Sequence, residues 1–352
     1  MANPKVIIAD TDINYIAPLQ YKFINDYFNN IDIEVITDKL YFEEYFAVPR
    51  NAEVLIVSED LYDSSLKRHD IKNIFLMSEQ LDDGSTGDLS INKIYKYTSI
   101  VEIFREITAK CAKELAEGAV EQKETQIIVV TSASGGVGKT TVAMGLAASL
   151  ADGYQRVLYI NAAMMQNFQY LMDNKEPIST YDIYAKALNP TENIYIDLKS
   201  EIRHQGFAYL PAFKAALISM GIQYSIYHKI ILSAKKSGDF DFIIVDTDSC
   251  FDEEKMNLID ISDKVIVVTD QSYSSVHATN NFVSNVNGIS QDKYVFICNR
   301  FNTAEYNELV TPNGTLKFNI SEYIANVVNR TDLEANIFSK NRDIKKISFL
   351  VM

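Results

Sequence analysis

The sequence predicts an α/β protein with two doubly wound parallel-sheet domains. Short continuous apolar runs alternate with amphipathic stretches along most of the 352 residues, and a stretch rich in Ala, Glu and Lys separates two such series. A continuous apolar run is typical of a strand covered on both faces, as in a parallel sheet flanked by helices. The length is sufficient for two domains, each with a core of its own.

The first series predicts an N-terminal domain over residues 1–108. One amphipathic helix is expected from about Tyr15 to Phe28, where apolar residues recur at helical spacing. The predicted strands are Lys5–Ala9, Ile33–Thr37, Ala52–Val57, Ile74–Met77 and Lys93–Tyr95.

Residues 109–124 are predicted to be a helix that runs into a solvated linker, with the domain boundary near Lys123. Residues 125–352 form the second predicted domain. Its predicted strands are Gln126–Thr131, Arg156–Ile160, Phe240–Val245, Lys264–Val268 and Tyr294–Ile297. The tail Arg342–Met352 is short and β-rich in composition, which favours a terminal strand or a packed tail over a membrane-binding amphipathic helix.

A glycine-rich loop between a predicted strand and a predicted helix is the strongest functional signal. After Thr131 the chain reads Ser-Ala-Ser-Gly-Gly-Val-Gly-Lys-Thr-Thr, followed by helix-forming residues. Such a loop, a P-loop, cradles phosphate oxygens with backbone N–H groups, and the helix N-terminus adds its positive dipole. We predict that it binds ATP or a closely related nucleotide with Mg²⁺. The predicted nucleotide-binding residues in the loop are Ser134, Gly135, Gly136, Val137, Gly138, Lys139, Thr140 and Thr141.

An apolar strand that ends in an acid supports the P-loop. The chain reads Phe-Ile-Ile-Val-Asp from residue 242, so Asp246 is predicted to hold Mg²⁺ directly or through water, together with the Thr140 hydroxyl. Many α/β strands end in Asp, so this signal depends on the P-loop that precedes it.

These segments, with Val157–Ile160 and Phe296–Arg300, resemble the MinD/ParA class of dimeric P-loop ATPases. The resemblance implies a homodimer, and it implies that Asn299 and Arg300 contact the adenine base. An Asn in a strand-end turn is the alternative interpretation.

Two features of that class are missing. The resemblance places a lysine where this chain has Ser134, and an acid that positions the attacking water where it has Ala163. Asn161 is left as a possible water contact. Removal of a charge that stabilises phosphoryl transfer costs on the order of 10³–10⁵ in rate. We therefore expect nucleotide binding with very weak or no hydrolysis.

The N-terminal part resembles the receiver domains of response regulators, which are flavodoxin-like. The positions that fit the pattern are Asp10, Asp12, Ser78 and Lys96. Ser58 stands where the phosphoacceptor Asp belongs, and Glu59 and Asp60 follow it out of register. Asp10 and Asp12 fit better as capping acids at a helix N-terminus. The pattern indicates a degenerate receiver-like domain that docks other proteins.

A receiver-like domain followed by an atypical MinD/ParA-type ATPase resembles the TadZ/CpaE family. That resemblance implies an ATP-binding localisation or assembly protein for the tight-adherence (Flp) pilus secretion machinery, whose proteins would be its partners at a cell pole. The alternatives are an active MinD/ParA-type ATPase in partitioning or cell positioning, and a bacterial tyrosine kinase. The kinase is disfavoured because no tyrosine follows Tyr323.

Composition and charge bear on the partners, the location and the cysteines of the protein. A net charge of −14 argues against nucleic acid as a specific partner. No apolar run approaches the roughly 18 residues of a membrane span, and Asp10 precedes any secretory apolar region, so we expect a cytoplasmic protein with at most indirect membrane contact. The scattered Cys111, Cys250 and Cys298 are expected to be buried free thiols, not cluster ligands.

Overall fold

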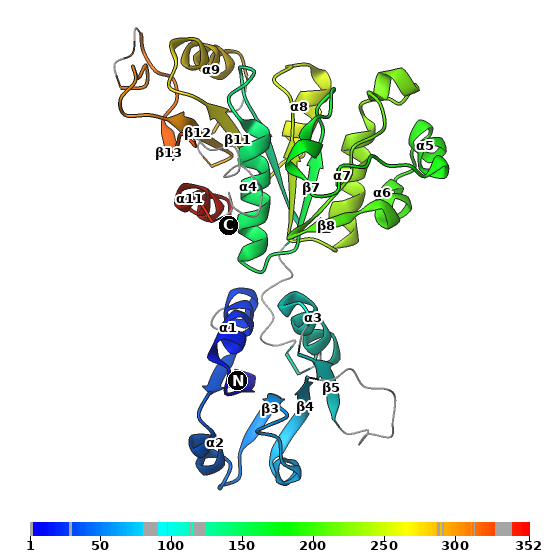
Figure 1. The fold of residues 1–352 in the computed structure, drawn as a ribbon, viewed down its shortest axis with the longest axis vertical. Helices are drawn as coiled ribbons and strands as arrows, with labels where there is room; N and C mark the ends of the chain where they lie inside the picture. Colours follow the sequence, from blue (N-terminus) through cyan, green and yellow to red (C-terminus); the bar gives the residue numbers. More distant parts are fainter. Residues whose placement is uncertain are drawn as a thin grey trace. The chain divides into compact units, whose positions relative to one another are not determined.

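The computed structural model divides into two compact units, residues 1–123 and 124–352 (Figure 1). The structure describes residues 3–27, 30–79, 91–96, 98–112, 114–115, 124–286, 289–290, 292–310, 312, 314–327 and 340–352. Among them, no helix has the length and apolar character needed to cross a membrane.

The N-terminal unit is a five-stranded parallel sheet in the order β2-β1-β3-β4-β5, the flavodoxin-like order. Helices cover both faces, α1 and α3 on one and α2 on the other. The strands are β1 (Lys5–Ala9), β2 (Asp32–Ile36), β3 (Asn51–Ser58), β4 (Asp70–Ser78) and β5 (Asn92–Tyr95). The helices are α1 (Ile13–Tyr27), α2 (Lys39–Tyr45), the 3₁₀ turn η2 (Ser64–Arg68) and α3 (Ile100–Lys110).

All five predicted strands of this unit are present, and β4 differs most in its bounds. It begins at Asp70 instead of Ile74 because its first residues alternate between exposed and half-buried positions. A continuous apolar run marks only the fully covered second half of such a strand. Most of the helix expected at 109–124 lies outside the described residues, and α3 ends at Lys110 before it.

The C-terminal unit is an eight-stranded sheet in the order β13-β12-β11-β6-β10-β7-β9-β8. All its pairs are parallel except β8 with β9, so the sheet is mixed and the predicted α/β class is confirmed. The strands are β6 (Gln126–Thr131), β7 (Val157–Asn161), β8 (Arg203–Gln205), β9 (Phe207–Tyr209), β10 (Phe242–Asp246), β11 (Lys264–Thr269), β12 (Tyr294–Phe301) and β13 (Ile320–Ala325). The short strands β8, β9 and β13 were not predicted.

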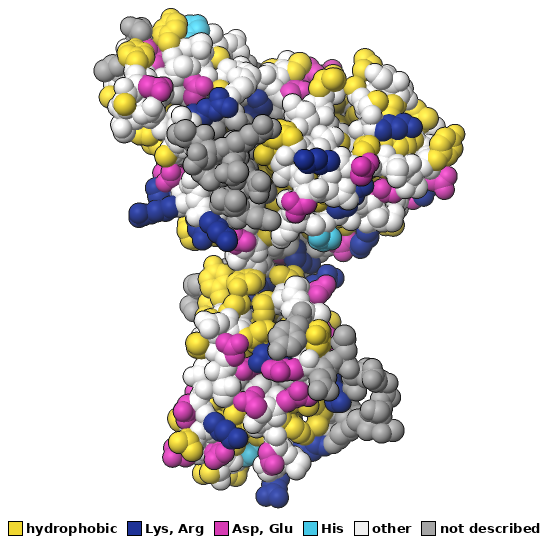
Figure 2. All heavy atoms as spheres, in the orientation of Figure 1, with side chains coloured by type: hydrophobic (Ala, Val, Ile, Leu, Met, Phe, Trp, Pro, Cys, Tyr) yellow, Lys and Arg dark blue, Asp and Glu magenta, His cyan; other side chains and the backbone are white. Residues whose placement is uncertain are grey.

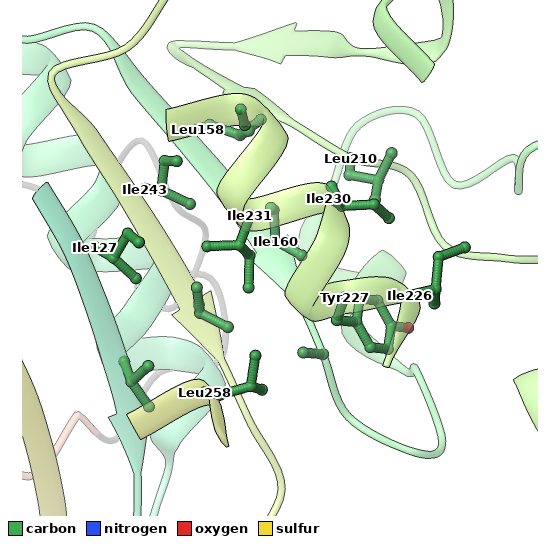
Figure 3. Packing of buried hydrophobic residues seen from close by; sticks show 14 of the residues in the cluster. Ile127, Leu158, Ile160, Leu210, Ile226, Tyr227, Ile230, Ile231, Ile243 and Leu258 are labelled. Carbon is green, nitrogen blue, oxygen red and sulfur yellow. The ribbon is translucent and has the colours of Figure 1, made fainter. Parts of the chain in front are cut away.

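Helices cover both faces of this sheet as well. They are α4 (Lys139–Asp152), α5 (Tyr181–Leu188), α6 (Ile194–Leu198), α7 (Ile226–Ser237), α8 (Glu253–Asp260), α9 (Tyr273–Asn285) and α11 (Arg342–Val351), with 3₁₀ turns η3 (Phe168–Leu171), η4 (Lys199–Glu201) and η5 (Leu217–Met220). Side chains of β6 alternate between the two faces: Ile127 and Val129 enter one core cluster, Ile128 and Val130 the other. Figure 3 shows the first cluster, where α7 packs on the sheet through residues such as Ile230 and Ile231.

The second cluster contains α4 and α11, which lie side by side (Figure 1). Every residue from Val142 to Leu150 is buried, because α4 is enclosed by the sheet and by α11. The tail is therefore a helix, and the prediction of a strand there was wrong. The alternative of a packed tail is right: Ile344, Ile347 and Val351 are buried at helical spacing, and the Asn341 side chain caps the helix through Asp343 N.

Candidate functional site

The P-loop lies where β6, a central strand, passes into α4. Gly136 and Gly138 adopt left-handed backbone conformations, with φ of 76° and 89°, and Gly138 is the residue that caps α4. Gly138 is required for a second reason: a Cβ there would lie 2.3 Å from the Asn299 amide nitrogen. Gly138 has no side chain that could cap the first turn of α4, which leaves the N–H groups of that turn for a phosphate.

Lys139 is the first residue of α4 and is partly desolvated. Its ammonium donates a hydrogen bond of 2.8 Å to the Ser132 hydroxyl. Burial lowers the pKa of Lys139, an effect that Asp246 and Asp248 oppose and Lys255 reinforces. A cation held by a neutral hydroxyl in this environment gains stability when an anion such as phosphate binds beside it.

Asp246 ends β10 and is 1% exposed. Its Oδ2 accepts hydrogen bonds from Tyr159 Oη at 2.9 Å and from Asn161 Nδ2 at 2.6 Å. Its Oδ1 is buried and has no hydrogen-bond partner among the described residues. Burial raises the pKa of Asp246 to about 6, although the Thr140 hydroxyl, Tyr159, Lys139 and Asn161 all favour the ionised form.

This carboxylate fits a divalent cation. A buried acid oxygen without a partner is costly unless a cation or a proton satisfies it. The Thr140 hydroxyl acts on the same carboxylate, so the two predicted Mg²⁺ residues share one location. Oxygen ligands of this kind are those that Mg²⁺ prefers.

Tyr159 is a residue of the site that the sequence analysis did not identify. The parallel pairing of β7 with β10 sets Asn161 beside Asp246, and Tyr159, two residues earlier, points to the same face as Asn161. The sequence feature that could have identified Tyr159 is a side chain with a polar end, two residues before Asn161 in a buried strand.

The predicted water contact Asn161 is already engaged. Its amide nitrogen bonds to Asp246, and its Oδ1 accepts from Ala163 N at 3.3 Å. Ala163 brings only its methyl group and backbone to this position. Asn161 therefore orients the acid and the turn after β7.

Ser134, Thr140 and Thr141 lie in the loop and the first turn of α4, and all three are partly exposed. The Ser134 hydroxyl is 2.9 Å from that of Ser275 on α9. Val137 is buried at 1% exposure and anchors the loop in the core. Gly135 is exposed, and a Cβ there would lie 3.8 Å from Ser249 Oγ, so the loop after β10 lies against the P-loop.

Asn299 and Arg300 lie near the end of β12. The Asn299 amide donates to Val137 O at 2.8 Å, so this side chain holds the P-loop in place. Arg300 is exposed and has a φ of 56°. The structure brings Asn299 to the P-loop, and contact of either residue with a base stays a prediction.

The ion pair of Asp248 with Lys255 was also missed by the sequence analysis. Lys255, on α8, is 2% exposed and donates to Asp248 O at 2.6 Å and to Asp248 Oδ1 at 3.1 Å. The other carboxylate oxygen of Asp248 accepts from Met164 N at 3.0 Å. Lys255 and backbone donors hold the pKa of Asp248 below its usual range, against the effect of burial.

The N-terminal unit has its own polar cluster at the carboxyl ends of its strands. Lys96 and Asp10 form a buried ion pair of 2.7 Å. Glu59 accepts a hydrogen bond of 2.9 Å from the Ser78 hydroxyl. Asp12 Oδ1 accepts from Asn14 N at 3.0 Å in the first turn of α1, as a capping acid does. Ser58 is 2% exposed, and Asp60 bonds to the Thr11 hydroxyl.

The cysteines follow the prediction only in part. Cys111 and Cys298 are buried free thiols, but Cys250 is exposed, because it lies on the loop after β10 and not in the strand. Among the described residues, no group of three or more His, Cys, Asp or Glu side chains could hold a metal ion.

Residues 125–297 match the AAA domain family. The septum site-determining protein MinD of Buchnera aphidicola subsp. Baizongia pistaciae is 29% identical over 172 residues, which cover 47% of this chain and 61% of that protein. The chain spans less than two thirds of the length of the curated relatives it matches.

Two solved structures share the fold of the C-terminal unit. A ParA family ATPase from Chlorobium tepidum aligns over 64% of this chain and 98% of its own, with a TM-score of 0.52 and 17% identity. The cell division ATPase MinD of Pyrococcus furiosus also aligns over 64% of this chain and 98% of its own, with a TM-score of 0.52 and 18% identity. The C-terminal unit therefore has the α/β fold of these two ATPases and is similar in sequence to the AAA domain family and to MinD, and an α/β unit precedes it in the chain.

Proposed function

We propose that the protein binds Mg-ATP at the P-loop and hydrolyses it very slowly or not at all. The observation that carries this proposal is the pairing of the loop with Asp246. The left-handed Gly136 and Gly138 shape a phosphate cradle, and Oδ1 of Asp246, which has no hydrogen-bond partner in the described segments, would supply a cation ligand beside it. A bound Mg²⁺ would neutralise phosphate charge there.

Different residues of the site would bind the phosphates and the metal ion. The loop N–H groups and the Lys139 ammonium receive the phosphate tail, and Thr140 with Asp246 would hold the ion. Tyr159 and Asn161 keep Asp246 in one orientation through its Oδ2, which leaves Oδ1 for the metal. Asn299 keeps the loop in shape by bonding to Val137 O.

Weak hydrolysis follows from the two absent groups. Ser134 bonds to Ser275 of its own chain and carries no charge that could reach a partner's nucleotide. Ala163 has no side-chain group that could hold a water molecule, and Asn161 is engaged by Asp246. Nucleotide binding depends on the P-loop and Asp246, not on the two absent groups, so it should be retained.

We further propose that the nucleotide-bound homodimer is a localisation or assembly factor for the tight-adherence (Flp) pilus secretion machinery. The support is the order of the two units, a receiver-like sheet before a MinD/ParA-type domain, together with the site changes at Ser134 and Ala163. The N-terminal unit would dock the other pilus proteins. Figure 2 shows lysines and arginines scattered among acidic and uncharged side chains on the face it draws, which agrees with a partner other than nucleic acid.

The binding proposal is tested with Lys139→Ala. Titration with a fluorescent ATP analogue in Mg²⁺ should give saturable binding for the parent chain and a loss of at least about 100-fold in affinity for the variant, since the one full charge aimed at the phosphates is removed. Lys186→Ala, which breaks an exposed ion pair with Asp197, is the matched control and should bind as the parent does. A folded Lys139→Ala chain with unchanged affinity would contradict the assignment.

The pilus proposal needs a cellular test. Deletion of the gene in its own organism should abolish surface pili of this class, and the parent chain should restore them. A deletion strain with normal pili would contradict this role and leave the nucleotide proposal intact.

A further inference from the structure

The loop after β10 carries a charge pair beside the phosphate end of the P-loop. Asp248 lies two residues beyond Asp246, and Ser249 reaches to 3.8 Å from the position of a Cβ on Gly135. The carboxylate of Asp248 also bonds to Met164 N, which ties this loop to the segment after β7. Asp248 therefore lies between the P-loop and the turn that contains Ala163.

Lys255 approaches the same loop from the first turn of α8. Its ammonium is 2% exposed and makes two hydrogen bonds, both to Asp248. The charges of Asp248 and Lys255 both act on Lys139, with opposite signs. Asp248 would therefore repel an anion bound at Lys139, and Lys255 would attract it.

An uncompensated carboxylate in this position would repel a triphosphate. Two unit charges several ångströms apart interact by a few kcal/mol at an effective dielectric constant of about 20. Lys255, which is buried and bonded to the carboxylate, balances that charge. The terminal phosphate of a nucleoside triphosphate is the group whose charge distinguishes ATP from ADP at this end of the site.

We propose that the charge balance within the Asp248–Lys255 pair governs how strongly the site prefers nucleoside triphosphate over diphosphate, because Lys255 cancels the repulsion of Asp248 for the terminal phosphate. This inference rests on the proposed nucleotide site at Lys139 and adds the residues that discriminate between its ligands. Lys255 is a positioning residue in it, because it acts through Asp248.

The two single substitutions should shift the preference in opposite directions. Lys255→Met leaves the carboxylate uncompensated, so the ratio of ATP affinity to ADP affinity should fall about tenfold. Asp248→Asn leaves the Lys255 cation uncompensated and keeps a side chain of the same size, and the backbone oxygen at residue 248 still accepts from Lys255. The ratio should then rise several-fold. The double variant should return close to the ratio of the parent chain.

The experiment is calorimetric titration of the full chain and the three variants with Mg-ATP and with Mg-ADP. Lys186→Met is the control, since it removes an exposed lysine of α5 that pairs with Asp197 of α6, and α5 lies at the periphery of the unit (Figure 1). Its ratio should not change.

A purely structural role of the pair predicts another result. Both single substitutions would then weaken ATP and ADP together and lower the melting temperature, which leaves the ratio unchanged and overturns the proposal. If Lys255→Met fails to fold, the Asp248→Asn variant is sufficient as the test. A rise in its ratio of ATP affinity to ADP affinity supports the proposal, and no change or a fall overturns it. A parent chain that binds neither nucleotide contradicts the proposed function itself.

Discussion

At the scale of single residues, Asp246, the proposed Mg²⁺ ligand, lowers the stability of the protein without its ligand. Its carboxylate is buried, and within the described part of the chain only Oδ2 has hydrogen-bond partners. The pKa of about 6 shows that burial outweighs the hydrogen bonds to Tyr159 and Asn161 when no metal is present. Charging this group therefore destabilises the folded chain without its ligand.

We predict that Asp246→Asn stabilises the protein without Mg²⁺ and nucleotide. A carboxyl whose folded pKa is raised binds its proton more tightly than in the unfolded chain, so stability falls as pH rises from about 4 to 6. The full cost, about 3 kcal/mol by linkage, is reached above pH 6. Urea unfolding should show a gain for the variant at pH 8 that shrinks to about a third at pH 4.5. A variant less stable than the parent at pH 8 would show that the carboxylate is not strained.

The weak hydrolysis should be reversible at two residues. We predict that Ser134→Lys with Ala163→Asp raises steady-state phosphate release at least about tenfold, because the change returns a cation and a water-positioning acid. The two single variants are the controls, and their rates of phosphate release should rise less than that of the double variant. Turnover by the parent chain on the order of 1 s⁻¹, an ordinary enzyme rate, would mean that another residue performs this chemistry.

Among the elements, α4 and α11 decide how the P-loop is supported. The loop opens into α4, which is buried on all sides from Val142 to Leu150 because α11 covers the side that the sheet leaves open. The tail helix therefore stabilises the element that presents Lys139. Its own outer face is apolar in part, with Phe349 68% exposed.

We predict that Ile347→Ala destabilises the C-terminal unit by about 2–4 kcal/mol, the usual range for a fully buried isoleucine. Phe349→Ala, two residues away and largely exposed, is the matched control and should change stability by less than about 1 kcal/mol. Chemical unfolding followed by circular dichroism measures both. Equal effects would mean that α11 does not pack on α4 in solution.

At the scale of the whole molecule, the carboxyl edge of the C-terminal sheet carries the P-loop, and a symmetric partner can cover such an edge. We predict a two-fold dimer through this unit in both apo and Mg-ATP forms, since Ser134 provides no charged contact that would make association depend on nucleotide. Light scattering at micromolar concentration is the measurement. A monomer in both forms contradicts the dimer, and a dimer seen only with ATP means that other loop contacts govern association.

The sequence alone determined the α/β class, the five strands of the first unit, the central strands of the second and the P-loop. These features depend on short-range physics: apolar runs long enough to be buried, and glycines where the backbone must turn to present its N–H groups. The strands β8 and β9 were not predicted because three residues are too few for a periodic pattern. The six-residue β13 was not predicted because it has only one fully buried residue and therefore no continuous apolar run. The tail was misjudged because composition alone does not show which face packs.

Only the tertiary structure decided which polar groups meet. Tyr159 joins Asp246, 87 residues away, through the parallel register of β7 and β10. Lys255 meets Asp248, seven residues earlier, because α8 begins directly after the loop. Asn299 lies 162 residues from the P-loop carbonyl that it holds. Contacts between residues distant in sequence depend on strand order and helix placement, which result from packing of the whole core and leave no local pattern in the chain.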